Sequence, residues 1–214
     1  QYAVYDAAGN ELKALTVTNG EIHGSATVNL KLTTGNTYSV VFWAAAPNAP
    51  YTVDFANKKM TVNYANAVSN DEKRDAFYKY HTFTVNGAQT EAIELRRPFA
   101  QLNIGTKDYA ASASAGYTPT HSAVTVKNLK NTLNFFNGEV SGDEYARVFA
   151  SAAIPADQEF PVADCEYIAM NYLLVGADKE TVEVEFTYSD GSNAKTRTVG
   201  SVPVQRNYRT NIYG

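Results

Sequence analysis

The sequence predicts an all-β protein of antiparallel strands packed as β-sandwiches, with one short helix. Short runs in which apolar and polar residues alternate recur along the chain between turn residues, whereas long runs with a period of 3.6 are nearly absent. The 214 residues include 15 tyrosines and 10 phenylalanines, which favour pleated, half-buried surfaces. Two packed sandwiches fit this two-part series of strands better than one closed barrel.

Length and charge narrow the possible classes of protein. A chain of 214 residues can form one large β domain or two smaller ones. The formal net charge is -4, and Lys and Arg are scattered along the chain, so we expect no nucleic-acid partner. No run of about 18 apolar residues is present that could cross a membrane as a helix. The single cysteine, Cys165, is expected to be a small buried hydrophobic side chain.

Four strands are expected at the start of the chain. Residues 27–32 alternate in polarity, and residues 37–46 form a nearly continuous apolar run after the turn TTGN, so the two segments predict a hairpin with one central strand. Residues 51–55 and 60–64 predict a second hairpin, in which each strand has one apolar face.

One short helix is expected around residues 70–78. Ser69 and Glu72 have the spacing of a capping box, and acidic side chains there suit a helix N-terminus. The polar segment at residues 86–91 is then the expected boundary between two domains, one over residues 1–90 and one over residues 91–214.

The second half begins with a strand over residues 99–106, followed by a long loop rich in small residues at 107–122. The segment 181–199 is a clear hairpin with Phe186 and Tyr188 on its apolar face. The other expected strands lie at residues 122–129, 132–136, 166–176 and 201–214.

Catalytic and metal-binding patterns are missing from the sequence. His23, His81 and His121 lie far apart without metal-ligand spacing, and no nucleophile elbow, phosphate loop or dinucleotide fingerprint occurs. Most acidic residues alternate outward on strands and so belong to a solvated face. We therefore expect a protein that is not an enzyme, with no catalytic residues, no cofactor and no metal.

Tyrosines raise the alternative of glycan binding, because exposed aromatic rings can form a platform for sugars. Packing in the core or across strands explains tyrosines equally well, and Trp43 lies inside an apolar strand. The candidates for an exposed platform are Tyr2, Tyr5, Tyr109, Tyr117, Tyr145 and Tyr208.

Several segments resemble the fimbrillin-like surface proteins of Bacteroidales bacteria, which are related to type V pilins. The matching segments are YAVYDAAGNEL, GNTYSVVFWA, VSNDEKRDAFY, LRRPFAQLNIGT and VPVQRNYRTNIYG. The resemblance implies two transthyretin-like β-sandwich domains in tandem, export as a lipoprotein to the outer membrane, and a role as a pilus subunit, tip or anchor. It implies no catalytic residues.

Arg96, Arg97 and Pro98 stand at the start of the strand after the expected boundary. Proline is tolerated at the first residue of a strand, because the missing N–H costs no ladder bond there. We expect Arg96 and Arg97 to bond across the junction between the domains, where guanidinium groups can reach carboxylates or free carbonyls. The alternative is a solvated strand edge protected by charge.

The resulting functional expectation is a structural or adhesive protein of the cell surface that assembles by strand addition. Compared with its relatives, the first sandwich looks one strand short, so its edge is expected to accept a donor strand from another pilin subunit. The alternative is a glycan-binding lipoprotein of the outer membrane that recognises a host or microbial surface. Contact with a membrane is expected only through a lipid anchor outside this chain.

Overall fold

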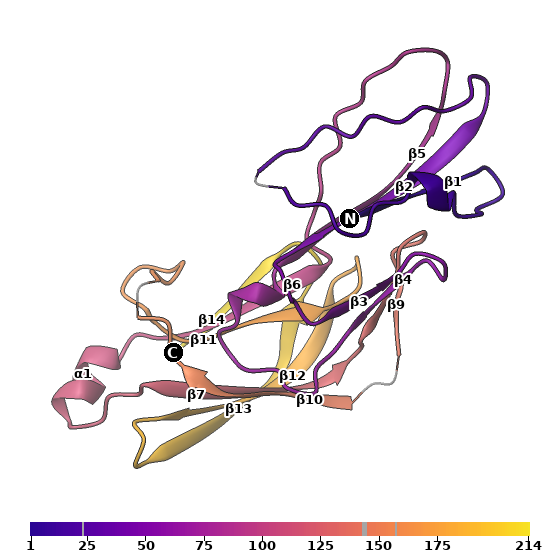
Figure 1. The fold of residues 1–214 in the computed structure, drawn as a ribbon. Coiled ribbons are helices and arrows are strands. Elements are labelled where there is room, and N and C mark those ends of the chain that lie inside the picture. The colour runs from indigo at the N-terminus through magenta and orange to yellow at the C-terminus, as the bar shows by residue number, and fades with distance from the viewer. Residues whose placement is uncertain (23, 143–144, 157) are drawn as a thin grey trace.

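The computed structural model describes residues 1–22, 24–142, 145–156 and 158–214, and these residues form fourteen strands in four sheets and one α-helix (Figure 1). The prediction of an all-β protein with one short helix is confirmed. Among the described residues, no helix is long and apolar enough to cross a membrane.

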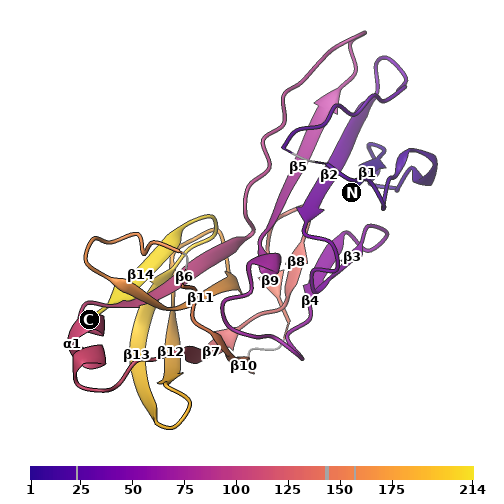
Figure 2. The ribbon, with the colours of Figure 1, turned by 60° about the vertical axis from the view of Figure 1, so that its left-hand side comes forward.

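The N-terminal sheet has the strand order β1-β2-β5 and is antiparallel throughout. Its strands are β1 (Tyr2–Tyr5), β2 (Thr37–Ala45) and β5 (Ala76–Thr84). β2 is the predicted apolar strand, and it is central because β1 and β5 occupy its two edges. Figure 2 shows β2 and β5 extending away from the other sheets.

A second sheet joins segments that are distant in the sequence. Its strand order is β3-β4-β8-β9, with β3 (Tyr51–Asp54), β4 (Lys59–Val62), β8 (Thr132–Asn134) and β9 (Val140–Ser141). The predicted hairpin over residues 51–64 is present as β3 and β4, and Met60 on β4 pairs with Leu133 on β8. This sheet therefore takes strands from both of the predicted domains.

The C-terminal region is a sandwich of two sheets. One has the order β10-β7-β12-β13, with β7 (His121–Leu129), β10 (Tyr145–Ala153), β12 (Glu180–Ser189) and β13 (Ala194–Val204). The other has the order β11-β6-β14, with β6 (Phe99–Thr106), β11 (Glu166–Leu174) and β14 (Arg209–Tyr213). β14 runs parallel to β6, whereas the other pairs are antiparallel.

The sheet β11-β6-β14 lies between two apolar clusters, which explains why β6 is buried from Phe99 to Gly105. Leu102 and Ile104 face the cluster inside the sandwich, here called the sandwich core, together with Phe149 and Val184. Phe99 faces the other cluster, here called the central core, which also contains residues of the N-terminal sheet and of the β3-β4-β8-β9 sheet. A strand buried on both faces needs an almost continuous apolar run.

Two predicted elements are wrong. Residues 27–32 form no strand, because β1 and β5 already fill both edges of β2; Leu30 and Leu32 instead pack across the face of the N-terminal sheet. The helix predicted at 70–78 is only a 3₁₀ turn at Glu72–Arg74, followed by β5. Pairing of β5 with β2 outweighs the local capping signal.

The one α-helix of the described chain, α1 (Tyr109–Ser114), lies instead inside the predicted loop at 107–122.

The expectation of a missing first strand requires an open edge at β1, but the structure shows this edge covered. Tyr2 exchanges two backbone hydrogen bonds of 2.8 Å with Val17, and the Leu12 N–H donates to the Val4 carbonyl at 2.7 Å. Residues 11–17 of the same chain thus cover the edge that a donor strand was expected to fill.

Candidate functional site

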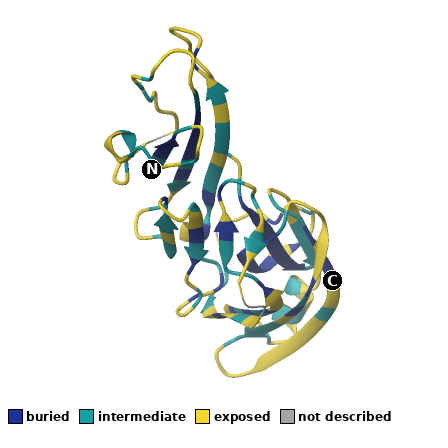
Figure 3. Cartoon of the chain, turned by 90° about the vertical axis from the view of Figure 1, so that its right-hand side faces the viewer, coloured by how far each residue is buried: buried dark blue, intermediate teal, exposed yellow. Residues whose placement is uncertain are grey.

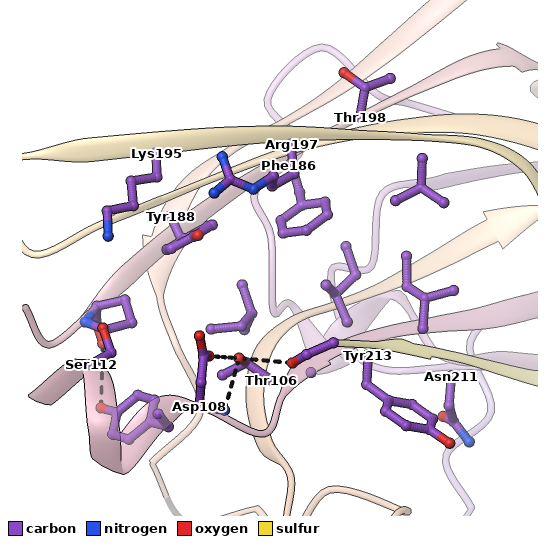
Figure 4. A pocket seen from close by; sticks show the side chains of 18 residues that line it. Thr106, Asp108, Ser112, Phe186, Tyr188, Lys195, Arg197, Thr198, Asn211 and Tyr213 are labelled. Carbon is purple, nitrogen blue, oxygen red and sulfur yellow. Dashed lines mark hydrogen bonds between the residues drawn. The ribbon is translucent and has the colours of Figure 1, made fainter.

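A cleft of about 680 Å³ opens at one side of the C-terminal sandwich, here called the sandwich cleft. The hairpin β12–β13 forms one wall, and β6, β14 and α1 form the other (Figure 4). β13 and β14 are edge strands of their sheets, and within the described residues neither outer edge pairs with another strand. β13 is also exposed along most of its length (Figure 3). The sandwich cleft is therefore the open side of the sandwich.

The β12–β13 wall carries two aromatic and two cationic side chains. Phe186 lies opposite Arg197 in the strand register, and Tyr188 lies opposite Lys195. Because alternate residues of a strand share a face, all four side chains project from the same face of the sheet. The rings of Phe186 and Tyr188 are stacked, with centroids 6.0 Å apart and planes inclined by 25°.

The opposite wall supplies hydroxyl and carboxylate groups. The Asn211 Oδ1 atom accepts a 2.8 Å hydrogen bond from buried Asn103, and both side chains lie on the face of the β11-β6-β14 sheet that points away from the β12–β13 wall. The Thr106 hydroxyl lies within hydrogen-bond distance of Asp108 and of the Gly214 carbonyl, either of which can accept its one proton. Figure 4 shows Thr106 and Asp108 between the two walls, whereas the side chains of Asn211 and Tyr213 point away from the β12–β13 wall. Together the two walls offer apolar rings and hydrogen-bonding groups around one space.

Tyr117 supports the hairpin from outside the cleft. Its hydroxyl donates to the Tyr188 carbonyl at 2.9 Å, and the Lys195 Nζ atom lies 4.0 Å from the centre of its ring. Burial, together with the negative charge of Asp190, raises the pKa of Tyr117. The phenol therefore stays a neutral hydrogen-bond donor and holds both Tyr188 and Lys195 in place.

The predicted junction residues lie elsewhere. Arg97 forms a bidentate pair with Asp75, with Nε–Oδ1 at 2.7 Å and Nη2–Oδ2 at 2.8 Å, and its guanidinium lies 4.8 Å from the centre of the Phe77 ring. This pair raises the pKa of the Arg97 side chain. Arg97 thus connects residues on opposite sides of the predicted boundary at residue 90, although the division into two domains itself stays a prediction.

Arg96 and Pro98 have different roles from Arg97. The Arg96 backbone bridges to Tyr78 through two hydrogen bonds of 2.9 and 3.1 Å, while its side chain is largely exposed and 3.4 Å from Glu94. Pro98 is buried immediately before the start of β6. A second pocket of about 430 Å³ borders Arg96 and Arg97 and includes Tyr208.

The predicted tyrosine platform is divided among several places. Tyr5 is wrong as a candidate, because it is fully buried and donates a 2.8 Å hydrogen bond to the Phe55 carbonyl. Tyr109 lines the sandwich cleft, and Tyr117 contacts its wall. Tyr145 and Tyr208 are exposed at other sites. Sequence reasoning thus found two tyrosines at or near the cleft.

Sequence reasoning missed the four side chains of the β12–β13 wall as a site. The alternation places Phe186 and Tyr188 on the apolar face of the hairpin, and both pack against the sandwich core, but it does not group them with the cations of β13. The sequence does contain a pattern that could predict this grouping. In a hairpin around the turn SDGSN, residue 195 pairs with residue 188, and residue 197 pairs with residue 186. Aromatic and cationic residues on one face of a hairpin end are unusual for a core.

Metal binding finds no support in the described residues, where no three His, Cys, Asp or Glu side chains gather. His81 bonds to Glu91 in the N-terminal region, and His121 lies at the start of β7. His23 lies outside the described residues. Cys165 is a buried free cysteine, as predicted.

Comparison with known proteins gives the family of the chain and other proteins with its fold. The chain belongs to DUF6562, a family of unknown function, which it matches over residues 1–214. No curated protein matches it.

Several solved structures have a similar fold. A candidate polysaccharide-binding protein from Bacteroides thetaiotaomicron has a TM-score of 0.56 at 16% identity, with 99% of this chain and 80% of that chain covered. A candidate adhesin from Bacteroides ovatus has a TM-score of 0.58 at 10% identity, with 99% and 78% covered. A candidate cell adhesion protein from Bacteroides fragilis has a TM-score of 0.52 at 15% identity, with 99% and 78% covered. At these identities the similarity shows the fold alone.

Proposed function

We propose that this chain is a non-enzymatic adhesion protein of the bacterial cell surface and that it binds a glycan in the sandwich cleft. The observation that carries the proposal is the pair of stacked rings, Phe186 and Tyr188, facing an open cleft whose other wall carries hydroxyl and carboxylate groups. A pyranose ring presents apolar C–H faces that lie against aromatic rings, while its hydroxyls exchange hydrogen bonds with such groups. The names of the similar structures, which refer to adhesion and polysaccharide binding, support the same proposal.

The surface location belongs to this proposal. The resemblance to fimbrillin-like proteins supports attachment to the outer membrane through a lipid anchor outside these residues, as a pilus subunit, tip or anchor. It also supports two transthyretin-like domains, although the β3-β4-β8-β9 sheet combines strands from residues 1–90 and 91–214. Adhesion explains why the site offers binding groups on a rigid scaffold.

Retention on immobilised polysaccharides tests glycan binding. We expect the wild-type chain to bind at least one bacterial or host polysaccharide, and the double variant Phe186→Ala/Tyr188→Ala to bind it about tenfold more weakly. Tyr145→Ala is the matched control, because this tyrosine is 59% exposed on β10 outside the cleft. Thermal unfolding checks that each variant is folded. Failure of the wild type to bind any member of a broad panel rejects glycan binding.

A second candidate function is assembly by strand addition at the same opening. Among the strands that the structure describes, β13 and β14 present unpaired outer edges beside the apolar side chains Val199 and Ile212. An extended segment from a neighbouring subunit could pair with either edge and place alternate side chains in the cleft.

Hydrogen exchange distinguishes the two functions. Strand addition predicts that backbone amides of residues 209–213 become protected as the protein concentration rises and oligomers appear in sedimentation. Glycan binding predicts a monomer whose β14 amides exchange at the same rate at every protein concentration. An unchanged exchange rate at the highest attainable concentration removes strand addition at this edge.

A further inference from the structure

The charge of the sandwich cleft differs from that of the whole chain. The chain has a net charge of -4, yet the β12–β13 wall presents Lys195 and Arg197 two residues apart on one face. Neither cation forms an ion pair with a carboxylate of the described residues; Lys195 lies over the Tyr117 ring, and Arg197 donates to the Thr196 carbonyl at 3.0 Å. Both side chains are exposed to solvent.

Negative charge on the other wall does not balance these two cations. Asp108 is the one acidic side chain among the described residues that line the cleft, and it accepts the Thr106 hydroxyl. The cleft therefore carries a local excess of positive charge around its aromatic pair.

This arrangement favours one kind of sugar over another. Guanidinium binds a carboxylate or sulfate through two parallel hydrogen bonds, and such charge-assisted bonds are about twice as strong as neutral ones. A neutral sugar needs only the rings and the hydroxyl and carboxylate groups of the other wall. An added peptide strand needs only the free backbone edges and the apolar base of the cleft. Neither of these two ligands uses the cations.

We propose that the sandwich cleft binds an acidic saccharide, with a pyranose ring against Phe186 and Tyr188 and its carboxylate or sulfate group on Arg197 and Lys195. This inference rests on the proposed glycan binding and specifies the class of glycan.

Calorimetric titration with three oligosaccharides of equal length tests the inference: an oligogalacturonate, its fully methyl-esterified form, and a sulfated heparin fragment. We expect the uncharged ester to bind about tenfold to a hundredfold more weakly than the oligogalacturonate. The affinity for the acidic sugar should also fall as the salt concentration rises. The heparin fragment shows whether sulfate replaces carboxylate.

Charge-removing variants locate the effect. Lys195→Gln/Arg197→Gln should reduce binding of the acidic sugar to the level of the ester and leave binding of the ester unchanged. Lys127→Gln is the matched control, because Lys127 is 55% exposed on the opposite face of the same sheet, paired with Glu183. Thermal unfolding compares the stability of the folded variants.

The outcomes separate this inference from the function on which it rests. Equal affinity for the ester and the acidic sugar overturns the acidic preference and leaves glycan binding in place. Loss of acidic-sugar binding in the Lys127→Gln control assigns the charge effect to another surface and also overturns the inference. Absence of binding to all three sugars, together with no retention on the polysaccharide panel, overturns both proposals.

Discussion

The N-terminal sheet and the C-terminal sandwich solve the same problem, an apolar sheet face that must be covered, in different ways. In the C-terminal sandwich two sheets face each other across the sandwich core. In the N-terminal sheet, the face away from the central core is covered by a segment without strands, which contributes Leu12, Leu15, Leu30 and Leu32. A sheet face can thus be covered by spaced leucines alone, but without the hydrogen-bond ladder of a second sheet.

The two regions also differ in local stability: the β12–β13 hairpin is held by a hydrogen-bond ladder, whereas the segment that covers the N-terminal sheet is not. The proposed binding groups lie on the hairpin β12–β13, whose strands form a ladder from Glu180 to Val204. The cover of the N-terminal sheet has few buried side chains and few backbone partners, which are the marks of low local stability. We therefore expect substitutions in the two regions to differ in how much they lower the free energy of unfolding and in how far they change hydrogen exchange along the chain.

The largest expected effect is loss of packing in the sandwich core. Phe149→Ala removes a fully buried ring that contacts Tyr64 edge to face and should lower the free energy of unfolding by about 3–5 kcal/mol. Val148→Ala is the control, since Val148 lies next to it on β10 and is 55% exposed; its effect should stay within about 0.5 kcal/mol. Urea unfolding measures both. Similar losses in the two variants contradict the assignment of the core.

A smaller and local effect is expected in the cover. Leu30→Ala/Leu32→Ala should speed hydrogen exchange in residues 38–41 of β2 while the exchange of β11 stays unchanged. The global free energy of unfolding should fall by only about 1–2 kcal/mol, because both leucines are half-buried. Hydrogen-exchange mass spectrometry follows both strands. Equal acceleration in β11 shows instead that the two regions open as one unit.

The Arg97–Asp75 pair, which links the two regions, should contribute still less to the free energy of unfolding. Arg97→Ala removes the bidentate pair with Asp75, whose side chains are 33% and 20% exposed, and should cost about 1 kcal/mol after solvent screening. We expect a broader distribution of interatomic distances in small-angle scattering, because the cores stay intact while the N-terminal sheet gains freedom. Arg96→Ala, at a side chain 66% exposed, should leave the profile unchanged. Identical profiles for the two variants and the wild type remove the role of Arg97 as a link.

The smallest expected effect is a pH dependence shared by one turn in each region. Hydrogen bonds from Asn10 lower the pKa of Asp6, and those from Asn193 and Ser192 lower the pKa of Asp190. Since each pKa is lower in the folded chain than in the unfolded chain, folding gains stability above the unfolded pKa and loses it as the pH falls below about 4.

Carboxyl chemical shifts in an NMR titration measure both groups. Asp190→Asn should remove the acid-induced loss that arises from the C-terminal turn and leave the titration of Asp6 unchanged. Folded-state values equal to those of model peptides contradict the proposed turn bonds.

Sequence reasoning succeeded where local pattern and pairing agree. The alternation in residues 181–199 around SDGSN fixed both strands and the turn, and the apolar run at 37–46 identified a central strand. It failed where tertiary pairing decided the outcome. Residues 27–32 have a strand pattern but find no free edge, and residues 76–84 pair with β2 despite a helix-like start.

The candidate site could be predicted only in part, because it is an opening between two sheets. Tyr109 and Tyr117 were recognised as exposed aromatic candidates from a small-residue loop. The wall that β14 contributes depends on the parallel pairing of β14 with β6, over 100 residues earlier in the chain, and no local sequence pattern predicts this pairing. The sequence of an apolar strand face also does not show whether a second sheet covers the whole face or leaves one end open as a cleft.

The pairing of β4 with β8 has a consequence for the order of folding. Lys59 to Thr61 find their partners at residues 132–134, so the β3–β4 hairpin cannot be completed into its sheet until more than half of the chain is available. Closing such a long loop before contacts compensate for it is slow, and the waiting hairpin exposes an unpaired edge. During synthesis or export, this edge is a point where premature association with another chain competes with folding.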